Sequence, residues 1–65
     1  MQLVFVIKDN KVKEAYEKHI EQGEMALIPE WQGITVDEIE DRLKAKFEKV
    51  SKIREVGNEI VYEVE

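Results

Sequence analysis

The sequence predicts a small α/β domain, a two-layer sandwich in which two helices pack mainly on one face of a mixed sheet of three or four strands. Three observations predict this fold: a short apolar run near the N-terminus, an amphipathic helical pattern over residues 34–50, and two alternating runs on either side of Gly57-Asn58. The expected element order is β-α-(β)-α-β-β. A chain of 65 residues has room for one hydrophobic core, so residues 1–65 are expected to form a single domain.

The first apolar run, L-V-F-V-I, is rich in β-branched side chains, which is typical of a strand. Side chains alternate between the two faces of a sheet, so Leu3, Phe5 and Ile7 share one face, and Val4 and Val6 share the other. Because both faces are apolar, we expect a central strand that is covered on both sides.

The segment after this strand predicts a helix. Asp9 or Asn10 is a suitable N-cap, and Gly23 is a typical residue for a helix C-terminus. Between them, side chains of apolar or aromatic character recur at helical spacing, namely Val12, Ala15, Tyr16, His19 and Ile20.

Residues 25–28, M-A-L-I, leave two interpretations open. They form either a short strand that completes a right-handed β-α-β unit, or an ordered loop whose side chains close the ends of the helices. In both cases Pro29 ends the segment, and Trp31 lies in the loop before the second helix.

The second helix has the clearest start in the chain. Thr35 is placed as the N-cap with Glu38 three residues later, and Ile34 and Ile39 are placed to contact each other across this first turn. The apolar stripe of this helix consists of Val36, Ile39, Leu43, Phe47 and Val50. Acidic residues in its first half and basic residues in its second half complement the helix dipole.

Gly57-Asn58 predicts a hairpin with a two-residue turn of type I′ or II′. Counting outward from the turn gives the expected pairs Val56 with Glu59, Glu55 with Ile60, Arg54 with Val61, Ile53 with Tyr62 and Lys52 with Glu63. This register puts Ile53 and Tyr62 on the face toward the helices, and Arg54, Val56 and Val61 on the opposite face.

The composition excludes several functional classes. A formal net charge of -5 argues against general affinity for a phosphate backbone, and the absence of cysteine excludes disulfides and thiolate metal sites. No apolar run approaches the roughly 20 residues of a membrane helix, and no basic leader precedes the first apolar run. We therefore expect a cytoplasmic protein that neither enters a membrane nor carries a signal peptide.

No group of residues predicts catalysis, a metal site or a cofactor. His19 is the one side chain that titrates near neutrality, and its place in the apolar stripe favours a structural role at the edge of the core. Acidic residues at the start of the second helix lack the spacing of a calcium loop, and isolated glycines do not form a phosphate-binding loop. We expect a protein without enzymatic activity.

The candidate binding surface is the sheet face turned away from the helices. It is expected to expose an apolar stripe of Val4, Val6, Val56 and Val61 next to Arg54, and exposed apolar patches usually mark interfaces. This predicts a homodimer through the sheet face or a sheet edge, unless the helices cover both faces. Trp31 is a second candidate for protein binding, although burial in the small core is the favoured role for it.

Two functions are consistent with these features. The first is a small acidic protein-interaction or regulatory module, which includes an inhibitor of a basic, nucleic-acid-binding partner. The alternative is a nucleic-acid-binding module that uses the C-terminal hairpin and the basic side chains Lys44, Lys46, Lys49, Lys52 and Arg54. Carboxylates interleaved among these basic residues make the alternative the less favoured one.

Overall fold

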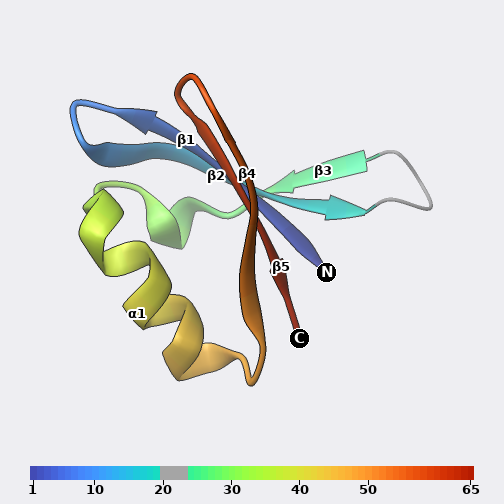
Figure 1. The fold of residues 1–65 in the computed structure, drawn as a ribbon. Helices are drawn as coiled ribbons and strands as arrows, with labels where there is room; N and C mark the ends of the chain where they lie inside the picture. Colours follow the sequence, from blue (N-terminus) through green and yellow to red (C-terminus); the bar gives the residue numbers. More distant parts are fainter. Residues whose placement is uncertain (20–23) are drawn as a thin grey trace.

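The computed structural model describes the backbone of residues 1–19 and 24–65 (Figure 1). Five strands form one sheet in the order β3-β2-β1-β5-β4, and every neighbouring pair is antiparallel. The elements are β1 (Gln2–Lys8), β2 (Lys11–His19), β3 (Glu24–Leu27), the 3-10 turn η1 (Pro29–Trp31), α1 (Val36–Lys46), β4 (Val50–Val56) and β5 (Glu59–Val64).

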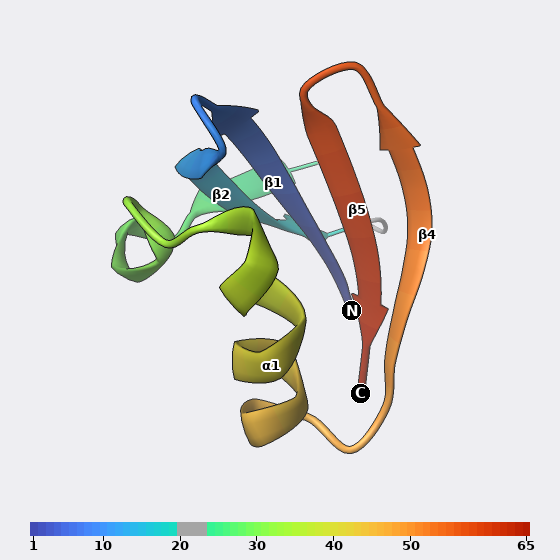
Figure 2. The ribbon, with the colours of Figure 1, turned by 60° about the vertical axis from the view of Figure 1, so that its left-hand side comes forward.

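The domain combines helix and sheet as predicted, but the described residues contain one α-helix instead of two. The sheet has five strands instead of three or four, and it is antiparallel instead of mixed. Figure 2 shows α1 and the turn η1 on one face of the strongly twisted sheet. We call this the inner face. In the described part of the chain no second helix covers the other face, which we call the outer face.

The first predicted helix is wrong, because residues 11–19 form strand β2. Asp9 and Asn10 do not cap a helix. Their φ angles of 54° and 64° are those of a two-residue type I′ turn, which joins β1 to β2 as a hairpin. The predicted helix end at Gly23 lies outside the described residues, as does Ile20.

The open question about residues 25–28 is answered by a short strand, Glu24–Leu27. This strand β3 runs antiparallel to β2, so the expected parallel β-α-β unit is absent from the described residues. The chain then continues along β2, because the Ile28 amide donates to the Ala15 carbonyl at 2.8 Å and the Val12 amide donates to the Ile34 carbonyl at 2.8 Å. Both ends of the segment between β3 and α1 are thereby hydrogen-bonded to β2.

Helix α1 begins where the sequence predicts and ends earlier. Thr35 occupies the N-cap position with an extended backbone, although its side chain makes no capping hydrogen bond. The predicted helix reached Val50, but α1 ends at Lys46, since Phe47 is extended and Val50 begins β4. Val50 therefore joins the sheet, where the restricted χ1 angle of a β-branched side chain is favourable.

The C-terminal hairpin has the predicted turn, in which Gly57 has a φ of +61°. The three pairs next to the turn are confirmed, from Val56 with Glu59 to Arg54 with Val61. Beyond them the prediction fails, because a β-bulge at Ile53 pairs Lys52 with Tyr62. Ile53 was expected to face the helices, yet it has no cross-strand partner and is 51% exposed.

The core lies between the inner face and α1. Phe5 is fully buried at its centre, with its ring centroid 4.9 Å from that of Trp31 and 5.9 Å from that of Tyr62. Both pairs are edge-to-face, at interplanar angles of 67° and 79°, which is a favourable arrangement of aromatic quadrupoles. From α1, Ile39 and Leu43 close this cluster with no exposed surface.

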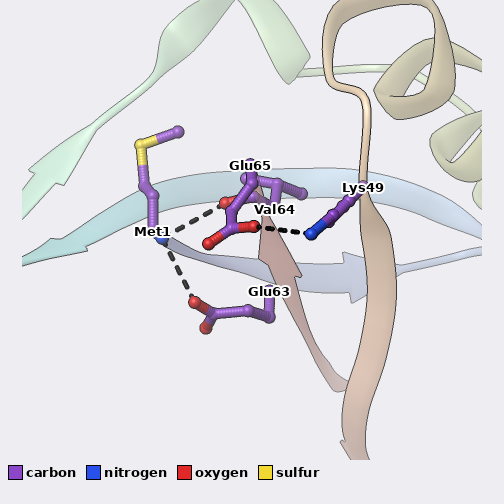
Figure 3. Close-up of polar contacts among 5 residues, drawn as sticks. All are labelled: Met1, Lys49, Glu63, Val64 and Glu65. Atoms are coloured by element: carbon purple, nitrogen blue, oxygen red, sulfur yellow. Dashed lines mark hydrogen bonds and ion pairs between the residues drawn. The ribbon is translucent and has the colours of Figure 1, made fainter.

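The two ends of the chain are adjacent (Figure 3). The Val64 amide donates to the Met1 carbonyl at 2.9 Å, and the Met1 amino group lies 3.2 Å from Glu63 Oε1. Nearby, Lys49 Nζ lies 3.7 Å from Glu65 Oε2. These exposed ion pairs contribute little stability, so the alignment of the ends depends mainly on the pairing of β1 with β5.

Candidate functional site

The outer face carries a row of side chains that crosses all five strands. The strand register places Leu27 of β3 opposite Tyr16 of β2, Tyr16 opposite Val4 of β1, Val4 opposite Val61 of β5, and Val61 opposite Arg54 of β4. We call these five residues the central row. Because residues directly opposite each other point to the same face, the row is one continuous surface feature.

The two valines at the middle of the central row are much less exposed than predicted. Val4 is 8% exposed and Val61 is 5% exposed, so the expected exposed valine stripe is wrong for this pair. They lie low between longer neighbours, and Val61 contributes to the floor of a shallow hollow of about 240 Å³. The hollow is bordered by Gln2, Lys18, Ile53 and Arg54.

Exposed apolar side chains stand at both ends of this row instead. Leu27 is 53% exposed at the β3 end, and Ile53 is 51% exposed at the β4 end, where the bulge turns it outward. Val56 is 63% exposed, while Val6 is half-buried. The outer face therefore has a sunken centre and apolar edges.

Charged side chains lie on both sides of the central row. On the side of the β4–β5 turn, the register aligns Glu14, Val6, Glu59 and Val56. On the other side it aligns Lys18, Gln2, Glu63 and Ser51. Three carboxylates and two basic groups, Lys18 and Arg54, thus share the outer face.

Tyr16 is held in place within the central row. Its hydroxyl donates a hydrogen bond to a carboxylate oxygen of Glu14, two residues before it on the same strand. This hydrogen bond raises the pKa of Tyr16, with smaller contributions from burial and from the Glu14 charge. Tyr16 therefore presents a neutral, oriented ring at neutral pH.

Trp31 is not part of the outer face. It lies in η1 on the inner side, is 3% exposed, and belongs to the core cluster around Phe5. The Lys46 ammonium lies over the Trp31 ring, 5.7 Å from its centroid, in a cation–π arrangement. The same ammonium lies 3.5 Å from Glu30 Oε1. The structure thus places Trp31 where the sequence analysis favoured it.

The predicted basic patch is divided among several elements. Lys46, Lys49 and Lys52 lie within 3.7 Å of Glu30, Glu65 and Glu55 respectively. Lys52 and Arg54 pair with Tyr62 and Val61, whose side chains lie on opposite faces, so the bulge between them separates the two cations. The five side chains do not converge on one surface.

Within the described part of the chain, no three His, Cys, Asp or Glu side chains are grouped so that they could hold a metal ion. His19 is the last residue of β2, and its side chain lies outside the described ones. Tyr62, whose pKa is raised to about 12, lies in the core.

Tyr16, Lys18 and Leu27 belong to this surface but were not predicted to do so from the sequence. The helical spacing around Tyr16 and Lys18 predicted a helix there and so removed both residues from the sheet. The signal that could have found them was Asp9-Asn10, since both residues tolerate positive φ and therefore suit a hairpin turn. The hairpin at that position, together with an extra residue at Lys13, puts Tyr16 opposite Val4.

Within residues 1–19 and 24–65, no helix has both the length and the apolar character needed to cross a membrane. Comparison of the chain with known proteins finds no matching family model, no matching curated protein and no matching solved structure.

Proposed function

We propose that this protein is a non-catalytic, cytoplasmic protein-interaction module that binds its partner on the outer face of the sheet. The observation that supports this proposal most directly is the central row, a cross-strand line of Leu27, Tyr16, Val4, Val61 and Arg54 with no helix packed over it among the described residues. Antiparallel sheets can leave one face in water, but that face is then normally polar.

The exposed ends of the outer face supply the apolar area for binding. Leu27, Ile53 and Val56 each expose more than half of their surface, and covering them fully contributes about 1 kcal/mol apiece. Between them, the hollow above Val61 offers a place for a partner side chain. Tyr and Arg, both present in the central row, are the residue types most often found at binding hot spots.

Charge supports a protein partner over a nucleic acid. The net charge of -5 opposes a phosphate backbone and attracts basic protein surfaces at long range. The basic side chains that the alternative requires are partly paired with carboxylates, with Lys46, Lys49 and Lys52 all in ion pairs. No structural observation favours the nucleic-acid alternative.

Site-specific photo-crosslinking in cells that express the protein tests this proposal. A photoreactive residue at position 27 or 56 should give crosslinks to protein, because both side chains are exposed on the outer face. The matched control is position 41, an exposed position on α1. Crosslinks that form equally from position 41, or that fail to form from positions 27 and 56, would refute the proposed surface.

A further inference from the structure

We infer that the outer face binds a second copy of this chain, and that the two sheets pack face to face about a two-fold axis parallel to β1. This inference rests on the proposed function, since it names the partner of the same surface. A two-fold interface uses the same surface on both subunits, so it requires a surface that complements itself. The distribution of side chains on the outer face meets this requirement for one axis direction.

An axis parallel to the strands keeps each row opposite the same row and reverses the strand order. β1 then faces β1 of the second copy, β2 faces β5, and β3 faces β4. In the central row, Val4 faces Val4 of the partner subunit and Tyr16 faces Val61 of the partner subunit. The sunken Val61 of each copy thus meets the tyrosine ring of the other, and the two Val4 side chains meet at the axis.

The exposed apolar ends of the central row also meet in this arrangement. Leu27 on β3 faces the segment of β4 that holds Arg54 and the bulged Ile53 of the partner subunit. Leu27 and Ile53 are 53% and 51% exposed in the single chain. In the dimer, Leu27 of each copy covers Ile53 of the other, so this contact forms once at each end of the central row. Packing of exposed apolar groups against each other is the main source of association free energy.

Charge complementarity supports the same axis. Lys18 on β2 faces Glu63 on β5 of the partner subunit, at two symmetric places. Glu63 contacts the Met1 amino group through Oε1, and its side chain is 44% exposed, so it can still receive the lysine. Arg54 comes beside the Glu14–Tyr16 pair of the partner subunit, which offsets the unfavourable approach of Glu14 to Glu59 of the partner subunit.

The other in-plane axis, parallel to the central row, is less favourable. It keeps each strand opposite itself, so Glu14 faces Lys18 of the partner subunit favourably at two symmetric places. The approach of Glu59 to Glu63 of the partner subunit cancels this gain, and Arg54 in addition faces Arg54 of the partner subunit. Pairing of the chains through the β4 edge is also disfavoured, because Lys52 and the bulge at Ile53 are features that protect an edge strand. The charges therefore select the axis parallel to β1.

The dimer is expected to be weak. Val4 and Val61 are already nearly buried within one chain, so the additional buried area comes mainly from the ends of the row. Interfaces at the small end of the size range give transient complexes, and we expect a dissociation constant on the order of 100 µM.

Sedimentation equilibrium of the full chain from about 10 µM to about 1 mM tests the inference at concentrations on either side of this constant. Wild type should shift from monomer to dimer over this range, and Leu27→Asp should abolish the shift because it puts a charge into the apolar contact. Ala45→Asp, at an exposed position of α1, is the matched control and should leave dimerisation unchanged. Circular dichroism checks that both variants are folded.

A charge exchange tests the predicted axis. Lys18→Glu and Glu63→Lys should each weaken the dimer about threefold to tenfold, and the double variant should recover most of the loss. A strict monomer at about 1 mM would overturn the inference, and so would a dimer that is insensitive to Leu27→Asp and to the charge exchange. Crosslinks from position 27 to a different protein, together with a strict monomer, would overturn the inference and leave the proposed function standing.

Discussion

At the scale of single residues, Tyr62 connects the sheet to the helix. Its ring packs edge-to-face against Phe5 in the core, while its hydroxyl reaches Glu40 on α1. The pKa of Tyr62 is raised to about 12, chiefly by burial and further by the charges of Glu40 and Glu55 and the hydrogen bond to Glu40. All these contributions favour the neutral phenol in the folded protein.

The raised pKa of Tyr62 predicts a loss of stability at alkaline pH. In the unfolded chain the phenol ionises near its ordinary value of 10.0, whereas in the folded protein it ionises at about 12. The stabilising contribution is therefore fully present below pH 10 and is lost as the pH rises to about 12. Urea unfolding at a series of pH values should show this decline in the free energy of unfolding.

Substitution identifies the group responsible. Tyr62→Phe keeps the ring and removes the titrating hydroxyl, so the variant should lose less stability over the same pH range. Tyr16→Phe is the comparison variant. The pKa of Tyr16 is also raised, but mainly by a hydrogen bond to Glu14 only two residues away on the outer face, so its substitution should change the alkaline decline less. An unchanged alkaline decline in Tyr62→Phe would contradict the assignment.

At the scale of elements, the β1–β2 turn determines the fold of the N-terminal third. Asp9 and Asn10 both have positive φ, a backbone region that β-branched side chains avoid. Asn10→Val should therefore reduce the free energy of unfolding by about 1–2 kcal/mol, measured by chemical denaturation. If Asn10 capped a helix instead, circular dichroism would show helix loss upon this substitution.

Asn58 provides the matched control for this turn substitution. It is the second residue of the β4–β5 turn, but unlike Asn10 it does not have a positive φ. Asn58→Val should therefore cost clearly less than Asn10→Val. Equal losses at the two positions would mean that backbone conformation is not the cause.

A β-bulge explains why β2 could not be predicted from periodicity. The register pairs Val6 with Glu14 and Ile7 with Val12, which leaves Lys13 as an extra residue. Val12 and Ala15 are thereby both buried in the core although they are three residues apart, a spacing that is typical of a helix. The bulge at Ile53 caused the corresponding error in β4, where an apolar residue left the inner face.

Other elements were predictable because a local signal defined them. Thr35 and the apolar stripe located the start of α1, and Gly57 located the C-terminal turn with its first three cross-strand pairs. The central strand β1 was predictable because both of its faces are apolar. These signals act over a few residues, whereas the position of β3 depends on tertiary pairing with β2.

At the scale of the whole molecule, the strand order predicts unequal protection of backbone amides. β1 has neighbours on both sides and lies over the core, whereas β3 is a four-residue edge strand. Hydrogen exchange should be slowest in β1 and β5, at rates that report global unfolding, and fastest among the strands in β3. Amides of β3 that exchange as slowly as those of β1 would contradict this order.

Only part of the candidate surface could be predicted at this scale. Val4, Val61 and Arg54 were correctly placed on one face, because strand alternation and the hairpin turn are local properties. Their exposure could not be predicted, because Val4 and Val61 lie low between neighbours contributed by β2 and by the bulge of β4. The other half of the surface depended on β2, which periodicity assigned to a helix.

The pairing of β1 with β5 has a consequence for how the chain folds. The β1–β2 and β4–β5 pairs join segments that are close in sequence, and each hairpin can form early and independently. β1 and β5 come from opposite ends of the chain, so their pairing closes a loop that contains nearly every residue. Folding must therefore bring the two hairpins together around Phe5, and we expect this docking step to limit the rate.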